Sequence, residues 1–272
     1  MNPADSYSRM PGGGISRRPL HLIILADCSG STKGEKIQAL NYAIADMMSH
    51  LEEWEQDQEQ AQVFIRAIAF ATEPRWHIKD PVPVSGIRWK PLQSVHKGLT
   101  NMGPAFRLAA EALAPGQVER RALRPALLLI TDGLATDPPG VFEDGLAALM
   151  AQPAGKAALR LSLAIGRDAQ SEALNRFNGD PSVPVLVADS TEDIAGRLVI
   201  ASLAVSRMSE SGADRSAVAR KLFGTPPGGE IPSTIFNQDT IVLSDDKHNE
   251  YGAVAGHRGH GPRCGARGAR PR

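Results

Sequence analysis

The stretch LHLIILADCSGSTKG, from Leu20 to Gly34, decides the fold of this chain. It opens with an almost unbroken apolar run that ends at Asp27. A short run of this kind, closed by a turn, is typical of a strand that is buried on both faces. After the turn, apolar residues from Ile37 to Trp54 recur at helical spacing with polar residues between them. The sequence therefore predicts a strand, a tight loop and a long amphipathic helix, in that order.

The same alternation continues along the chain to about residue 206. Strands are predicted at 63–70, 125–131, 159–165 and 183–187, and helices at 103–113, 141–150, 171–177 and 191–206. Residues 74–90 contain four Pro or Gly residues and the short alternating pieces RWHIK and GIRW, which indicate antiparallel strands at a sheet edge. This order predicts an α/β, Rossmann-like fold: a mostly parallel central sheet with helices on both faces and one antiparallel edge strand.

Length and composition limit the number of domains. The chain has 272 residues, of which 42% are apolar and 22% charged, so it can form a sizeable core. We expect a flexible leader at 1–18, one domain at 19–208 and a low-complexity basic tail at 209–272. The tail has too few apolar residues to offset the entropy lost on ordering, which predicts disorder.

Charge and cysteine content restrict the function classes. Lys and Arg total 30, as do Asp and Glu, so the formal net charge is zero. This balance argues against bulk electrostatic attraction to nucleic acid or to an anionic membrane, although a local patch could still provide some. We expect neither a specific nucleic-acid partner nor a membrane. The apolar run from Leu20 to Ala26 is too short to span a bilayer, and Cys28 and Cys264 do not make a disulfide scaffold. We expect a soluble protein of the cytoplasm.

Oxygen-bearing side chains follow the predicted strands. Asp27, Ser29 and Ser31 come after the first strand, Asp132 follows the strand at 125–131, and Thr100 lies in the loop before the helix at 103. Ligands of open α/β sheets bind at this edge. Two carboxylates and three hydroxyls are hard ligands, which suit Mg²⁺ or Mn²⁺ with water in the remaining positions. Because two carboxylates leave the ion short of negative ligands, it favours a carboxylate from outside, which is a binding mechanism and not a hydrolytic one.

These residues, in this order, resemble the von Willebrand factor type A (VWA) domain. That family builds its metal ion-dependent adhesion site (MIDAS) from D-x-S-x-S, a distal Thr and a distal Asp. The resemblance covers roughly residues 19–208 and implies that the serines and the threonine bind the metal directly, while the aspartates often act through water. Leu99 stands where the family often has Gly, and Thr32 stands where it usually has Met. Neither departure removes a ligand.

Within this superfamily the chain looks most like the TerY-like proteins of bacterial tellurium-resistance and stress clusters. The resemblance is carried by DCSGS after LIILA, by TDGLATDPP after LLLI, and by LAIGRDAQSEALNRF followed by VPVLVADSTEDI. It implies a non-enzymatic adaptor or scaffold whose metal accepts an Asp or Glu from a protein partner. A Ser/Thr kinase and a PP2C-type phosphatase are the proteins with which such adaptors are associated.

Other interpretations of the same residues remain open. A metal-dependent phosphatase of the haloacid dehalogenase type would use Asp27 as nucleophile, but it needs a second Asp where Ser29 stands. Thiol chemistry at Cys28 would need an Arg six residues on, and position 34 is Gly. A third alternative keeps the fold, leaves the metal site idle and binds a partner elsewhere. Asp137 either supports the site from behind or only forms a turn.

Overall fold

The structure is a computed structural model that describes residues 17–166, 172–208, 218 and 221–222. The leader and the basic tail predicted from the sequence lie almost wholly outside these residues, so both remain predictions. Within the described ranges, no helix is long and apolar enough to cross a membrane.

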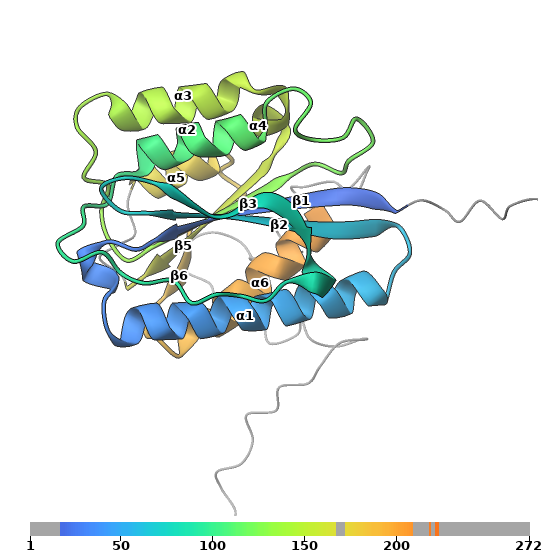
Figure 1. Cartoon of the computed structure of the whole chain (residues 1–272), viewed down its shortest axis with the longest axis horizontal. Helices are drawn as coiled ribbons and strands as arrows, with labels where there is room; N and C mark the ends of the chain where they lie inside the picture. The colour runs from blue at the N-terminus through green and yellow to red at the C-terminus, as the bar shows by residue number, and fades with distance from the viewer. Residues whose placement is uncertain (1–16, 167–171, 209–217, 219–220, 223–272) are drawn as a thin grey trace, which may run out of the picture. The chain divides into compact units, whose positions relative to one another are not determined.

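The described residues form six strands, six α-helices and two short 3-10 helices, which alternate along the chain as predicted (Figure 1). In chain order they are β1 (Arg18–Asp27), η1 (Gly30–Thr32), α1 (Glu35–Gln56), β2 (Ala61–Phe70), β3 (Arg75–Pro83), η2 (Val84–Gly86), α2 (Met102–Ala112), β4 (Ala126–Thr131), α3 (Val141–Ala151), α4 (Pro153–Ala157), β5 (Leu159–Ile165), α5 (Glu172–Asn178), β6 (Leu186–Ala188) and α6 (Asp193–Met208).

The strands form one sheet in the order β3-β2-β1-β4-β5-β6. All neighbouring strands are parallel except β2 and β3, so the predicted Rossmann-like sheet with one antiparallel edge strand is confirmed. The strand order reverses between β1 and β4, which is the place where ligands bind in such sheets. Because Ala26 pairs with Ile130, the next residues, Asp27 and Thr131, come side by side at the carboxyl ends of these two strands.

Each face of the sheet is covered by helices. Residues of β1 alternate between two hydrophobic clusters: Leu22 and Ile24 belong to the cluster on the side of α1 and α6, and Ile23 and Leu25 to the cluster on the side of α2, α3 and α5 (Figure 1). Beyond α6, the described residue Leu222 is also buried in the first cluster. The central strands are therefore buried on both faces, as their continuous apolar runs indicate.

One predicted edge strand does not form. The piece GIRW (86–89) lies outside the sheet and runs beside α1, where Asn41 binds it (Figure 1). The Asn41 Oδ1 accepts hydrogen bonds from Trp89 Nε1 (3.0 Å) and Leu92 N (2.7 Å), and its Nδ2 donates to Leu92 O (3.0 Å). The Asn41 amide thus binds the backbone of Leu92 and the indole of Trp89, and it holds this segment against α1 instead of beside β3.

The start of the last strand differs from the prediction, and one short helix is additional to the predicted ones. β6 begins at Leu186 and not at 183, because Val183 N donates to Asp180 O (3.0 Å) and closes a turn there. The short helix α4, with Pro153 at its first turn, follows α3 and was not predicted. Both corrections concern the side of the sheet away from β3 and leave the order of the central strands unchanged.

Helices α2 and α3 cross at two glycines. A Cβ atom on Gly103 would overlap the carbonyl of Val141, and one on Gly145 would overlap the carbonyl of Gly103. Only residues without side chains allow the two backbones to approach this closely. The crossing holds the N-terminus of α2, and with it the loop that carries Thr100, against the segment that follows β4.

Candidate metal centre

Three segments carry four of the five predicted site residues, and the fifth, Asp27, ends β1. For brevity we call them the first loop (28–36, from the end of β1 into the first turn of α1), the second loop (94–100, before α2) and the third loop (131–139, from the last residue of β4). The first and second loops are joined by backbone hydrogen bonds from Val95 N to Cys28 O (2.7 Å) and from Gly30 N to Gly98 O (3.0 Å). The second and third are joined by Thr136 N to Thr100 O (2.9 Å). The loops therefore form one connected edge of the sheet.

Asp27, the last residue of β1, is fully buried, and both of its carboxylate oxygens are engaged. Oδ1 accepts a hydrogen bond from Ser29 N (2.7 Å), and Oδ2 accepts one from the hydroxyl of Thr131 (2.6 Å). Burial raises the pKa of Asp27; the two hydrogen-bonding neighbours oppose this shift, and the charge of Asp132 adds to it. The carboxylate is thus fixed behind the first loop, in a place that a cation would stabilise.

Two serines connect this region to the end of β4. The Ser29 and Ser31 hydroxyl oxygens lie 2.9 Å apart, and Ser31 Oγ donates to Asp132 Oδ1 (2.7 Å). The 3-10 turn at Gly30–Thr32 produces this alignment, and Thr32 closes it by donating from its hydroxyl to Ser29 O (2.8 Å). Side chains two residues apart therefore point to one side of the loop, as the D-x-S-x-S spacing predicts.

Thr100 reaches the same place from the second loop. Its backbone N donates to Thr136 Oγ1 (2.8 Å), while its own hydroxyl has no hydrogen-bond partner among the described residues. A Cβ atom on Gly133 would lie 3.4 Å from Thr100 Oγ1 and 3.8 Å from Ser31 Oγ. Both hydroxyls therefore lie close to Gly133, the residue that follows Asp132.

The structure thus brings the five predicted residues together at one edge of the sheet. Asp27 lies buried behind the first loop, Ser29, Ser31 and Asp132 are joined by hydrogen-bond distances between their side-chain oxygens, and the Thr100 hydroxyl lies beside Ser31 across Gly133. No group of three or more His, Cys, Asp or Glu side chains placed to hold a metal occurs among the residues described. A metal here depends on hydroxyl oxygens, and this donor set fits a hard divalent ion. The role of these residues as ligands stays a prediction.

Sequence reasoning missed two residues that touch this group. Thr131, the last residue of β4, holds Asp27 through its hydroxyl. Lys36, in the first turn of α1, places its ammonium nitrogen 2.6 Å from Asp132 Oδ2. Thr131 could have been found from the sequence, because it directly precedes the predicted ligand Asp132 at the end of the same strand. No local pattern distinguishes Lys36 from a solvated helix lysine, because its contact with Asp132 spans 96 positions in the chain.

Asp137 caps a helix. Its two carboxylate oxygens accept hydrogen bonds from the backbone N–H groups of Met102 (2.9 Å) and Gly103 (2.7 Å) at the start of α2. Helix N-termini leave such N–H groups unsatisfied, so a carboxylate here stabilises the helix. Thr100 lies two residues before α2, so Asp137 also fixes the backbone next to Thr100 without being one of the predicted metal ligands.

Cys28 lies in the first loop but is buried, and burial raises the pKa of its thiol to about 12, with the nearby charge of Asp27 adding to the effect. A thiol with this pKa is protonated at neutral pH and is a poor nucleophile. The environment of Cys28 therefore gives no support to thiol chemistry at this edge of the sheet.

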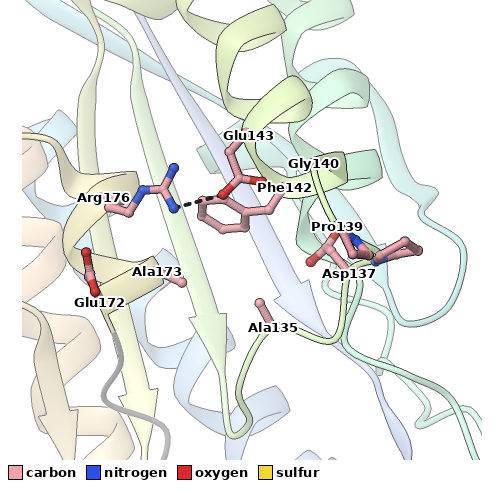
Figure 2. A pocket seen from close by; sticks show the side chains of 10 residues that line it. Ala135, Asp137, Pro139, Gly140, Phe142, Glu143, Glu172, Ala173 and Arg176 are labelled. Atoms are coloured by element: carbon pink, nitrogen blue, oxygen red, sulfur yellow. Dashed lines mark hydrogen bonds and ion pairs between the residues drawn. The ribbon is translucent and has the colours of Figure 1, made fainter.

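A pocket of about 340 Å³ lies beside the third loop, between the start of α3 and α5 (Figure 2). None of the five predicted site residues lines it. Arg176 crosses it to pair with Glu143 (2.9 Å) and lies 5.3 Å from the centre of the Phe142 ring. Asp137, on another wall, is bonded to α2. Most charged groups of this pocket are thus already engaged, so the three-loop site is the better candidate.

Comparisons with known proteins agree with the fold. No protein-family model matches the chain, and no curated protein matches it. Among solved structures, a von Willebrand factor type A protein from Catenulispora acidiphila is 16% identical, with a TM-score of 0.55 over 70% of this chain and 43% of that one. The PilB minor pilin of Streptococcus sanguinis is 13% identical, with a TM-score of 0.54 over 72% of this chain and 64% of that one.

A third similar structure is proximal thread matrix protein 1 of the mussel byssus, described with a zinc-occupied MIDAS motif. It is 14% identical, with a TM-score of 0.52 over 70% of this chain and 48% of that one. The chain spans less than two thirds of the length of each of these three proteins. At such identities the likeness shows the fold alone. The chain has the fold of a VWA domain, a class in which some members bind a divalent metal at a MIDAS.

Proposed function

We propose that this protein is a non-enzymatic, metal-dependent protein-binding module of the VWA family. Its MIDAS holds Mg²⁺ or Mn²⁺, and the ion accepts an Asp or Glu side chain from a protein partner. The observation that carries this proposal is the contact of Ser31 with Asp132 beside the free hydroxyl of Thr100. The residues that would hold the ion, directly or through water, are Asp27, Ser29, Ser31, Thr100 and Asp132.

The surroundings of Asp27 favour binding over phosphoryl transfer. A nucleophilic aspartate needs an oxygen that substrate can reach, whereas both oxygens of Asp27 are buried and hydrogen-bonded. The position two residues on is Ser29, whose hydroxyl cannot supply the proton that a leaving group needs. No observation favours the phosphatase alternative of the haloacid dehalogenase type.

The resemblance to TerY-like proteins supports a more specific role. In that role the module is an adaptor in a cytoplasmic stress-response or phosphosignalling complex of a bacterium, with a Ser/Thr kinase and a PP2C-type phosphatase as partners. The zinc-occupied MIDAS of the mussel protein supports a divalent ion of some kind in this fold. The preference for Mg²⁺ or Mn²⁺ rests on the oxygen-only donor set of this chain.

Calorimetry on the full chain tests the metal site. We expect one equivalent of Mn²⁺ to bind, Mg²⁺ to compete for the same site, and Asp132→Ala or Ser31→Ala to weaken or abolish uptake. The matched control is Asp144→Ala, which removes an exposed carboxylate of α3. Absence of metal uptake by the native chain, or equal loss in the control, contradicts the proposal.

A second measurement separates binding from catalysis. The Mg²⁺-loaded chain is incubated with p-nitrophenyl phosphate, and we expect no turnover above background. Turnover that disappears in Asp27→Ala would overturn the non-enzymatic assignment and restore the phosphatase alternative.

A further inference from the structure

Exposed apolar side chains concentrate around the candidate metal centre. Among the described residues four large hydrophobic side chains are exposed, and three of them lie on the second and third loops: Val95 (36%), Leu99 (49%) and Leu134 (57%). The fourth, Tyr42 (73%), is on α1. We call Val95, Leu99 and Leu134 the apolar collar. Exposed apolar groups gathered at one site indicate a contact surface, because water solvates them poorly.

The backbone beneath the collar is held in place. Leu99 N donates to Thr72 Oγ1 (3.1 Å), and Gly98 N donates to Val95 O (2.9 Å). Lys97, between them, has a φ of 56°, and it is the sole residue other than glycine with a positive φ in the described part of the chain. A left-handed backbone at such a residue costs on the order of 1 kcal/mol and persists where the surroundings require it. Val95 and Leu99 are thus presented by a fixed, locally strained turn, while Leu134 is carried by the third loop.

A bound divalent ion is what makes the three loops attractive to an acidic partner. The loops carry three lysines (Lys33, Lys36 and Lys97) and three carboxylates (Glu35, Asp132 and Asp137), so their formal charges cancel. Lys36 is already paired with Asp132. The ion therefore supplies the excess positive charge at the centre. A partner that buries this surface needs a carboxylate at its middle and apolar groups around it.

We propose that the apolar collar and the metal centre form one docking surface for a polypeptide segment in which an Asp or Glu is flanked by apolar side chains. This inference rests on the proposed function, since the metal supplies the central contact. Leu99 then has a role of its own: where the VWA family often has Gly, this chain presents a side chain that contacts the partner. The carboxylate determines that binding occurs, and the collar determines which acidic segments bind.

A membrane surface is the other class of partner that basic and apolar groups attract. The structure favours a polypeptide, because the Asp132 side chain at the centre is completely buried, and a single side chain reaches an ion held there more easily than a layer of headgroups does. The collar also contains no aromatic residue of the kind that anchors proteins at bilayer interfaces.

The test titrates the full chain, in the presence of Mg²⁺, with three short peptides. Binding is measured from the NMR chemical shifts of the protein. The probes are acetyl-Leu-Glu-Leu-amide, acetyl-Ser-Glu-Ser-amide and acetyl-Leu-Gln-Leu-amide. We expect the first to bind at least about fivefold more tightly than the second, as a few tens of Å² of apolar contact predicts. We expect no binding of the third. Leu134→Ser and Leu99→Ser should bring the ratio of the first two close to one, whereas Tyr42→Ser should leave it unchanged.

The outcomes separate the two proposals. Equal affinity for the first two peptides overturns the role of the collar and leaves the metal-dependent module intact. Failure of both glutamate peptides to bind the metal-loaded chain overturns the proposed function itself. Binding of the glutamine peptide, or tighter binding to phosphatidylserine vesicles than to the first peptide, also overturns the docking surface as described. The metal affinity of each variant is measured in parallel, so that a lost metal site is not mistaken for a lost collar.

Discussion

The ammonium nitrogen of Lys36 lies 2.6 Å from Asp132 Oδ2, and the side chain of Asp132 is wholly buried while that of Lys36 is 42% exposed. The other oxygen, Oδ1, accepts the hydrogen bond from Ser31. Lys36 thus neutralises a carboxylate that the proposed metal also uses. A divalent ion and the ammonium compete for the same negative charge, so the lysine should weaken metal binding.

Replacement of Lys36 by Met is therefore expected to tighten Mn²⁺ binding about fivefold, since a partly exposed ion pair is worth roughly 1 kcal/mol. Calorimetric titration of the full chain measures the change. The control is Lys33→Met, which removes the same charge from an exposed position on the first loop. An equal gain in both variants would mean that net charge alone is responsible, and weaker binding in Lys36→Met would make the lysine a supporting residue.

Thr131 is expected to stabilise the buried Asp27. Its hydroxyl donates a 2.6 Å hydrogen bond to Asp27 Oδ2, and the loss of a bond to a charged group costs about 2 kcal/mol. Thr131→Val should lower the free energy of unfolding of the metal-free chain by roughly this amount, as measured by urea denaturation. Thr131→Ser keeps the hydroxyl and serves as the control. If Thr131→Ser lowers the free energy of unfolding as much as Thr131→Val does, the effect comes from side-chain packing and not from the hydrogen bond.

Asp137 should be needed for the order of the α2 N-terminus. In Asp137→Ala, the N–H groups of Met102 and Gly103 lose their acceptor, so their hydrogen exchange should accelerate and stability should fall by about 1 kcal/mol. Metal affinity should fall with it, because Thr100 lies only two residues before α2. Asp144→Ala, on the surface of α3, should change neither quantity. Unaltered exchange at both amides in Asp137→Ala would contradict the capping role.

His77 is expected to make the fold less stable in mild acid. Burial lowers the pKa of His77 below its usual value of 6.5; the contact of Nε2 with Lys90 O opposes this shift, and the nearby positive charges add to it. The unfolded chain therefore binds a proton more readily than the folded chain, so stability falls as the pH drops through 6.5 and levels off below the folded pKa.

The comparison variant for this effect is His77→Phe, which keeps an aromatic ring beside Trp89 (ring centres 4.7 Å apart in the native chain). The stability difference between the two proteins is measured by urea denaturation at several pH values between about 5 and 8. The native chain should lose stability relative to the variant as the pH falls. A difference that is independent of pH would show that His77 does not titrate in this range.

Cys28 should resist alkylation in the native chain. Its thiol is buried and its pKa is raised to about 12, so little thiolate forms at pH 8. A Cys264→Ser variant leaves Cys28 as the single thiol, and mass spectrometry after iodoacetamide treatment measures its modification. We expect no adduct in buffer and full modification in urea. Rapid labelling of the folded protein would reopen the possibility of a reactive thiol.

Much of this fold follows from local pattern. The unbroken apolar runs at 20–26 and 125–130 indicate strands buried on both faces, and the helical spacing from Ile37 to Trp54 indicates the long helix between them. Side-chain periodicity is a property of neighbouring residues, so the sequence contains it directly. The segment 86–89 was misassigned because its partner, Asn41, lies more than 40 positions away in the chain.

For the candidate site too, part of the arrangement follows from local sequence and part only from tertiary contacts. The sequence alone determined which oxygen-bearing residues follow which strands, because a motif such as Asp27-x-Ser29-x-Ser31 is local and the ends of parallel strands share one edge. Only the tertiary structure decided that Ser31 meets Asp132, that Thr131 holds Asp27 and that Lys36 occupies one oxygen of Asp132. Such contacts join positions about 100 residues apart, and their geometry depends on strand order and on close helix packing, which no short stretch of sequence contains.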